Sequence, residues 1–379
     1  MKIVGILCEY NPFHLGHAKQ ISIIRESAEV ETAVVCLMSG NYVQRGHPAV
    51  FDKMLRARAA LQAGADLVLE LPVQYCLSSA EGFAAGAVSI LGSFCDEMSF
   101  GAEHPDTEKL RCTAKALLSP DFSRHLRQHL DAGLSFPAAR ARTLADMGAD
   151  AELVSSPNDI LAVEYCKAIL TQGSAMAPAP IRREGGYHDA QADPENPSAT
   201  SLRALIEAGR PFHSFVPTDL FRDAPVHTLQ YGEKAMLAKL RAMTDAEFEM
   251  LPYGSEGLWR KFMHECRRQN SLEDILTAVK SKRYTRTRLD RMAMCAFLGL
   301  TKDDLHALAP YARIMGFTNR GQQVLHTAKQ HTPLFNVGQR VDNPQWTLEQ
   351  RCNDLYGLFS EATEPAGMEL SRRVVLVRK

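Results

Sequence analysis

The segment Lys2–His17, with the sequence KIVGILCEYNPFHLGH, decides the fold of this 379-residue chain. Residues 2–8 form a short apolar run rich in Val and Ile, which predicts a buried strand. The polar, proline-containing residues 9–13 predict a turn, and His14 and His17 then open a predicted helix. Because residues three apart share a helical face, both imidazoles are expected on one side of a helix start, where backbone N–H groups favour phosphate.

Three further apolar runs, at residues 31–38, 67–72 and 97–100, alternate with helical patterns. Such alternation predicts an α/β fold with a Rossmann-like, doubly wound parallel sheet. Ligands of these sheets bind beyond the carboxyl ends of the strands, where the strand order reverses beside the first strand. We therefore expect Gly101 to lie near the two histidines, where a residue without a Cβ admits an adenine or a ribose.

The rest of the chain is predicted to be mainly helical. Residues 105–150 have the pattern of a helical insertion, and residues 179–183 resemble a last sheet strand. From Phe212 onward the pattern predicts helices and no strand before residues 372–377. The sequence thus predicts a sheet-containing domain over residues 1–210 and a mostly helical domain over residues 211–379.

Composition is that of an ordinary globular protein, with 45% hydrophobic and 23% charged residues. No apolar run is long enough for a membrane span, and no signal peptide is recognised, so we expect no membrane partner. The nine cysteines include no C-x-x-C pair and no zinc-finger spacing. They predict reduced thiols in a cytoplasmic protein, without a protein-bound metal site.

A basic segment stands out in the second domain. Six of the twelve residues from Lys280 to Arg291 are Lys or Arg. Such a run beside an aromatic ring is suited to a phosphate backbone and a stacked base, which indicates RNA. The alternative is a solvated helix start with Leu289, Met292 and Phe297 facing inward. On the RNA interpretation, the contacts come from Lys282, Arg283, Tyr284, Arg286 and Arg288.

The segments Gly5–His17, Met38–Gly46 and Gly64–Pro72 together resemble the tRNA(Met) cytidine acetate ligase family of the H-x-G-H nucleotidyltransferase superfamily. The resemblance implies an ATP-binding first domain and a helical second domain that contacts tRNA. It implies that acetate and ATP form acetyl-adenylate, and that the acetyl group passes to N4 of the wobble cytidine of elongator tRNA(Met). AMP and diphosphate would be released, and Mg²⁺ would accompany the triphosphate. The sequence gives no prediction of the oligomeric state.

The resemblance also implies site residues. His14 and His17 are expected to be catalytic, and Arg182 and Arg183 have the planar fork that suits phosphate. Asn158 is either an ATP ligand or a helix cap, and Ser198–Arg203 resembles the S-x-T-x-x-R turn of the superfamily. The residues expected to bind ATP are Leu7, Cys8, Glu9, Tyr10, Asn11, Pro12, Phe13, His14, Gly16, His17, Gly101, Asn158, Arg182 and Arg183.

Two other functions fit the same residues. A small-molecule adenylyltransferase would use the H-x-G-H pair but would not need a basic second domain. A non-catalytic protein could bind ATP and RNA without turnover. The roles of Asp66 and Glu70 have two alternatives. Both residues are predicted at strand ends, where they either stay hydrated or take a direct part in the site.

Overall fold

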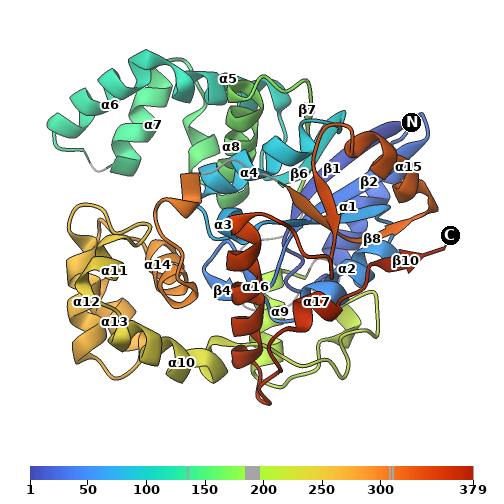
Figure 1. Cartoon of the computed structure of the whole chain (residues 1–379). Coiled ribbons are helices and arrows are strands. Elements are labelled where there is room, and N and C mark those ends of the chain that lie inside the picture. Colours follow the sequence, from blue (N-terminus) through green and yellow to red (C-terminus); the bar gives the residue numbers. More distant parts are fainter. Residues whose placement is uncertain (135, 184–196, 307–308, 310, 379) are drawn as a thin grey trace.

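The computed structural model describes residues 1–134, 136–183, 197–306, 309 and 311–378. One side of the molecule holds a twisted sheet, and two separate groups of helices lie at the other side (Figure 1). The upper group in this view is the predicted insertion, which consists of α5 (Thr107–Leu118), α6 (Pro120–Asp131) and α7 (Phe136–Asp146). The lower group belongs to the second half of the chain.

Within the described residues, eight strands form the main sheet, and the pairs around its first strand are parallel. These strands are β1 (Lys2–Cys8), β2 (Thr32–Ser39), β5 (Leu67–Leu71), β6 (Glu97–Ala102), β7 (Ala177–Arg182), β8 (Ala312–Thr318), β9 (Leu334–Asn336) and β10 (Val375–Val377). Their order is β10-β8-β5-β2-β1-β6-β7, with β9 paired to β8. The chain steps from β1 toward β5 and then returns to the other side of β1, so the predicted reversal lies between β1 and β6.

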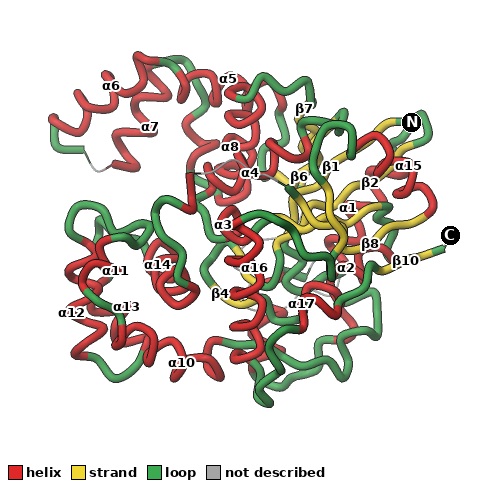
Figure 2. The backbone as a smooth tube through the Cα atoms, viewed as in Figure 1, coloured by secondary structure: helices red, strands yellow, loops and turns green. Residues whose placement is uncertain are grey.

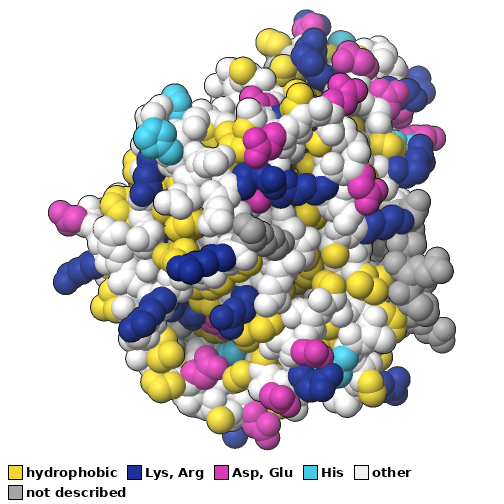
Figure 3. Space-filling model, turned by 90° about the vertical axis from the view of Figure 1, so that its right-hand side faces the viewer, with side chains coloured by type: hydrophobic (Ala, Val, Ile, Leu, Met, Phe, Trp, Pro, Cys, Tyr) yellow, Lys and Arg dark blue, Asp and Glu magenta, His cyan; other side chains and the backbone are white. Residues whose placement is uncertain are grey.

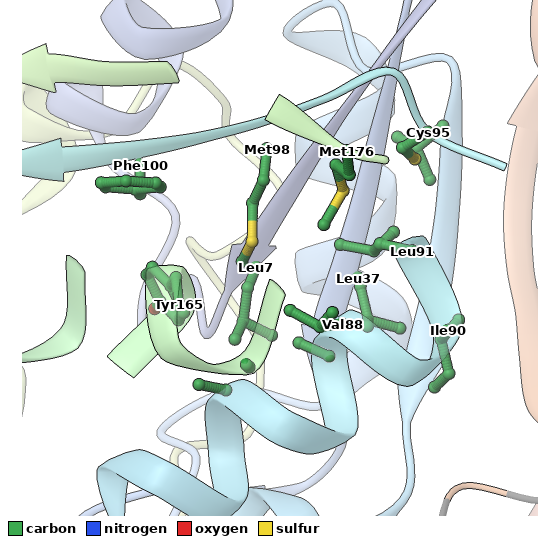
Figure 4. Close-up of a cluster of buried hydrophobic side chains, with 14 of the residues drawn as sticks. Leu7, Leu37, Val88, Ile90, Leu91, Cys95, Met98, Phe100, Tyr165 and Met176 are labelled. Carbon is green, nitrogen blue, oxygen red and sulfur yellow. The ribbon is translucent and has the colours of Figure 1, made fainter. Parts of the chain in front are cut away.

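The two faces of the sheet are covered because alternate residues of a strand point to opposite sides. Ile3 and Leu7 of β1 belong to one apolar core, whereas Val4 and Ile6 belong to the other. Leu7 lies beside Leu37, Val88 and Met98 in the first of these cores (Figure 4). The helices of this core are α4 (Ala80–Leu91), α8 (Pro157–Thr171) and α15 (Asn319–Ala328), and those of the other are α1 (Leu15–Glu26), α2 (Lys53–Gln62) and α9 (Ala199–Glu207).

The prediction that residues 212–371 contain no strand was wrong. The C-terminal part of the chain returns to the sheet, where β8 lies antiparallel to β5 and carries β9 and β10 in parallel (Figure 2). The sheet therefore does not end at the predicted boundary near residue 210. A short apolar run such as residues 311–317 gives no helix or strand period, so sequence alone could not distinguish the two.

The lower helical group has its own apolar core. The sequence predicted such a mostly helical part in the second half of the chain. It consists of α10 (Leu229–Ala242), α11 (Asp245–Glu249), α12 (Leu258–Arg268), α13 (Leu272–Val279) and α14 (Arg286–Leu298), and α16 (Pro344–Tyr356) joins its core to the sheet. Shorter elements connect these parts: β3 (Tyr42–Val43), β4 (His47–Pro48), α3 (Val73–Cys76), α17 (Met368–Ser371), and the 3₁₀ turns Ala151–Val154, His213–Phe215, Asp304–His306 and Gly357–Phe359.

Asp66 and Glu70 are buried and ion-paired, so the expectation that they stay hydrated was wrong. Asp66 pairs with Arg25 and accepts a hydrogen bond from the Val34 N–H at 2.9 Å, which ties two strands together. Glu70 pairs with Lys53 at 2.8 Å and with Arg313 of β8 at 2.7 Å. A buried carboxylate persists only when its charge is paired and hydrogen-bonded.

The Glu70 ion pairs extend into a cluster that fastens the end of the chain to the sheet. Glu369 of α17 pairs with Lys53 at 2.8 Å and with Arg313, and all four of these side chains are almost completely buried. Arg372 then pairs with Asp52 at 2.6 Å. This charged cluster, Lys53, Glu70, Arg313 and Glu369 with its extension Asp52 and Arg372, therefore joins α2 and β5 to β8 and α17.

Basic and acidic side chains are interspersed on the face seen in Figure 3, which is the side of the molecule where β10 and the chain's C-terminus lie in Figure 1. Within the described ranges of the chain, no helix is long and apolar enough to span a bilayer.

Candidate active site

A cavity of about 580 Å³ opens at the carboxyl ends of β1 and β6, where the strand order reverses. Nearly all residues predicted to bind ATP line it, while Pro12 and Phe13 are buried behind the wall and stay outside. Pro12 and Phe13 therefore do not line the cavity, and direct contact with ATP is not supported for them. Those that line the cavity are Leu7, Cys8, Glu9, Tyr10, Asn11, His14, Gly16, His17, Gly101, Asn158, Arg182 and Arg183.

The two histidines form the cap of α1. His14 is the N-cap, and its Nδ1 accepts a hydrogen bond from the Gly16 N–H at 3.1 Å. Nδ1 of His17 accepts one from the His14 N–H at 3.3 Å, and the two rings stack with centroids 3.7 Å apart. This arrangement is a capping box built from imidazoles, and it fixes both rings at the wall of the cavity.

The cap also determines the proton positions. A neutral imidazole whose Nδ1 accepts a hydrogen bond carries its proton on Nε2. Burial, with Arg183 and Arg203 nearby, lowers the pKa of His14 to about 3, and burial also lowers the pKa of His17 well below its usual range. Both rings are therefore neutral donors. Nε2 of His14 is buried and has no hydrogen-bond partner among the described residues, so it can donate to a bound ligand.

A second polar group lies at the start of α8. The Asn158 amide donates to Glu103 at 2.6 Å, and its carbonyl oxygen accepts from Arg183 at 3.0 Å. The N-cap of α8 is Ser156, so the capping alternative for Asn158 was wrong. A Cβ placed on Gly101 would meet only the Arg183 side chain, at 3.9 Å, which leaves the open space that the prediction required.

The predicted S-x-T-x-x-R turn begins α9 at the cavity wall, next to the loop that follows β1. Ser198 is the N-cap, and its hydroxyl accepts from the Ser201 N–H at 3.1 Å. Arg203 donates to the Asn11 carbonyl at 2.9 Å and to the Thr200 hydroxyl at 3.1 Å. The turn thus holds a hydroxyl pair and a guanidinium beside the first loop, and Ser198, Thr200 and Arg203 all line the cavity.

Two groups of lining residues were not assigned to the site from the sequence. His227, Thr228, Leu229 and Gln230 come from beyond the predicted domain boundary, and no local motif marks them. The hairpin β3–β4 contributes Gln44, Arg45 and His47. Gly46 of this hairpin has φ +84° and lies directly against Asp290 and Arg291 of α14, so the cavity wall touches the basic segment.

The basic segment is partly used by the protein itself. Arg286 forms a bidentate pair with Glu273 at 2.7 Å and a second pair with Asp290. Arg288 donates to the Tyr253 carbonyl at 2.7 Å, and its guanidinium lies 5.2 Å from the Tyr284 ring centroid. Leu289, Met292 and Phe297 are buried, as the helix-start alternative predicted, whereas Lys282 and Arg283 are exposed.

Mg²⁺ is the expected partner of the triphosphate. In the part of the chain that the structure describes, no three His, Cys, Asp or Glu side chains gather as a metal site. In the described part of the chain, the carboxylates that line the cavity are those of Glu9 and Glu207. We therefore assign no residue of this chain to Mg²⁺.

A family model described as HIGH Nucleotidyl Transferase matches residues 1–369. The tRNA(Met) cytidine acetate ligase of Clostridium novyi (strain NT) is 35% identical over 386 residues, which cover 96% of each chain. That of Clostridium acetobutylicum is 32% identical over the full length of both. Among solved structures, Thermotoga maritima TmcAL in its apo form I matches with a TM-score of 0.90 and 31% identity, and the form bound with alpha-thio ATP matches with 0.88 and 30%; both cover 100% of each chain.

These matches span the strand, the two-histidine cap and the cavity described above, and they reach far beyond the first motif. The chain therefore belongs to the HIGH nucleotidyltransferase family and is, within it, an enzyme of the tRNA(Met) cytidine acetate ligase group.

Proposed function

We propose that this enzyme uses ATP to convert acetate to acetyl-adenylate and then transfers the acetyl group to N4 of the wobble cytidine of elongator tRNA(Met), with release of AMP and diphosphate. One observation carries the chemical part of the proposal. The first helix presents two neutral Nε2–H donors at the wall of a cavity placed at the reversal of strand order. The names of the relatives supply the acceptor and the acetyl donor.

The first step needs stabilisation of charge at phosphate. Acetate is an anion and a poor electrophile, and its attack on the α-phosphorus of ATP builds negative charge on the phosphate oxygens. Fixed N–H donors aimed at such oxygens lower the barrier without reorganising. His14 and His17 are such donors, because the capping box already fixes their rings. Arg182 and Arg183 enter from the end of β7 and add positive charge at the cavity wall.

The nucleoside part of ATP is best placed at Gly101 and Asn158. Gly101 leaves room against the backbone, and Asn158 is held in position from both sides by Glu103 and Arg183. The triphosphate then extends toward the α1 cap and the hydroxyls of Ser198 and Thr200. Mg²⁺ bound to the triphosphate itself would neutralise part of its charge, with no protein ligand implied.

Contact with tRNA is proposed for the basic segment. Lys282 and Arg283 are exposed, and the segment lies against the hairpin that forms one wall of the cavity. An anticodon arm held there would bring its nucleotides toward the adenylate. The nine cysteines carry free thiols, eight of them buried, as expected for a reducing compartment, and we place the enzyme in the cytoplasm with its tRNA substrate.

The proposal is tested by incubating the protein with ATP, labelled acetate and bulk tRNA, and by digesting the tRNA to nucleosides. We expect label in N4-acetylcytidine, together with AMP and diphosphate. Diphosphate release that requires a mononucleotide and no acetate would support a small-molecule adenylyltransferase. Binding of ATP and tRNA without any product would leave only the non-catalytic alternative.

A further inference from the structure

We propose that Glu9 is the catalytic residue that accepts the proton of the cytidine amine during acetyl transfer. This inference rests on the proposed function and concerns its second step. The amine of cytosine is a weak nucleophile, and it must lose a proton when it is acylated. A group in the cavity that can take this proton is therefore required.

Glu9 lines the cavity, and one of its two carboxylate oxygens is anchored. The residue follows β1 directly and lines the cavity wall. Its Oε1 accepts a hydrogen bond from the Gln44 N–H at 2.6 Å, whereas Oε2 has no partner among the described residues. The Glu9 carbonyl is held by Arg56 at 2.6 Å, so the backbone is fixed as well. This geometry orients one acceptor oxygen before a substrate arrives.

The two histidines cannot take the proton in their observed arrangement. Nδ1 of each ring is already an acceptor within the capping box, and Nε2 of each ring carries a proton. Neither ring therefore presents a lone pair to the cavity. His47 also lines the cavity, but 42% of its side chain is exposed at the rim, beside Asp290. Among the described residues that line the cavity, Glu9 is the carboxylate that belongs to the same loop as the histidine cap.

The Glu9 carboxylate itself suits a cytosine better than a phosphate. It would repel a phosphate in direct contact, whereas a carboxylate accepts a hydrogen bond from the N4 amine of cytosine. Tyr165 and Phe100 form an aromatic pair with ring centroids 5.2 Å apart, and both belong to the same apolar cluster as Leu7 (Figure 4). Tyr165, Phe100, Phe83 and Leu161 line the cavity. A base turned out of its stack packs between such side chains.

The proposed step is balanced. The lone pair of N4 attacks the acetyl carbonyl carbon, and a C–N bond forms. The bond between that carbon and the phosphate oxygen breaks, and AMP leaves with the electron pair. The proton of N4 passes to Oε2 of Glu9, which becomes a carboxylic acid and later returns the proton to solvent.

The charges around Glu9 set the pH range of this role. Burial raises the pKa of Glu9 above its usual value, while the Gln44 N–H and three arginines oppose that rise. A carboxylate with a raised pKa is a stronger base than an exposed one. The groups that face it are Arg45 of the hairpin, Arg56 of α2, Arg203 of α9, Tyr165 of α8, and Cys76 of α3.

The test separates the two steps with Glu9→Gln. The amide oxygen of Gln can still accept from the Gln44 N–H, so we expect thermal stability close to that of the parent. Because Glu9 is also among the residues expected to bind ATP, adenylate formation without RNA is measured in the same variant at saturating ATP, and the loss in acetyl transfer should exceed any loss in this first step. Single-turnover acetyl transfer to tRNA should fall by about 10²–10⁴-fold. The parent transfer rate should also decline at acidic pH as Glu9 becomes protonated, and this decline should disappear in the variant, while Glu9→Asp restores part of the rate.

Three results would overturn the assignment. The first is a Glu9→Gln variant that transfers acetyl as fast as the parent. The second is an equal loss in adenylate formation, which would place Glu9 in the first step or in the fold. The third is a decline at acidic pH that persists in Glu9→Gln but vanishes in His47→Gln or Glu207→Gln. A parent protein that never labels tRNA would instead refute the proposed function, and this inference with it.

Discussion

Two clusters of polar side chains lie a few strands apart along the same sheet. They differ in whether a hydrogen-bonding atom is left unpaired and free to bind a ligand. In the charged cluster at β5 and β8, Lys53 and Glu369 are paired with each other, and both also pair with further charged side chains of the protein. At β1, the polar atoms of His14 and His17 are paired only on the side of the helix cap, and Nε2 of His14 has no partner in the described part of the chain. A buried polar group that is fully satisfied stabilises a fold, whereas one left half-satisfied at a cavity wall indicates a binding site.

The largest effect on stability is expected from Glu369→Gln. Removal of one charge leaves Lys53 and Arg313 buried with one counter-charge fewer, and breaking such a pair costs about 3–5 kcal/mol. Denaturant unfolding measures the loss. The exposed Glu361→Gln serves as control and should stay within about 0.5 kcal/mol of the parent. A Glu369→Gln protein as stable as the parent would show that the cluster does not hold the C-terminal segment to the sheet.

His14→Ala and His17→Ala should instead cause a large loss of activity and only a small loss of stability. Each removes one donor to the phosphates, so adenylate formation should fall by about 10²–10³-fold, while the cap loses about 1 kcal/mol. The measurement is AMP or diphosphate release with ATP and acetate, with unfolding measured in parallel. His326→Ala, on the exposed side of α15, is the matched control. Undiminished release by both cavity variants would remove the histidines from the mechanism.

The ion pair of Asp52 with Arg372 makes the stability contributed by the charged cluster depend on pH. Burial alone would raise its pKa, but Arg372 holds the pKa of Asp52 at about 2, below the 3.8 of an unperturbed carboxyl. Because the folded-state pKa is the lower one, the stabilisation is present above about pH 4 and is lost as pH falls toward 2. Asp52→Asn should therefore cost about 2 kcal/mol at pH 7 and little at pH 2.

Unfolding of parent and Asp52→Asn at several pH values between 7 and 2 checks this expectation. A difference that stays constant over the range would show that the ion pair with Arg372 is not its source.

The smallest expected effect is in the basic segment, where arginines already have protein partners. Replacing Lys282, Arg283, Arg286 and Arg288 by Ala should leave adenylate formation unchanged and weaken tRNA binding. Each lost phosphate contact should reduce the salt slope by about one. Tyr284→Ala should cost about 1–3 kcal/mol in binding if the ring stacks on a base.

Since Arg286 and Arg288 are tied to Glu273 and Tyr253, and Arg283 pairs with Glu256 at 2.7 Å, a Lys282→Ala single variant separates an exposed contact from structural ones. Parental tRNA affinity and salt slope in a folded quadruple variant would mean that RNA binds elsewhere.

Much of the sheet and of the first cap could be predicted, because those features are local. The alternation of strand and helix through residue 183 and the histidine spacing at α1 each depend on a few neighbouring residues. The return of β8 could not be predicted, since it depends on Arg313 meeting Glu70 across 243 positions of the chain. The same holds for His227 and Gln230, which reach the cavity only through the fold. The sequence also placed Arg286 among the RNA contacts, although in the structure it pairs with Glu273. Glu273 lies on another helix, so this ion pair could not be read from the basic segment.

The most direct test of the central claim is isotope exchange between diphosphate and ATP in the absence of RNA. If the cavity forms acetyl-adenylate reversibly, labelled diphosphate should enter ATP only when acetate is present, and His14→Ala should reduce the exchange by about 10²–10³-fold. Exchange that needs no acetate, or that proceeds equally in His14→Ala, would contradict the account.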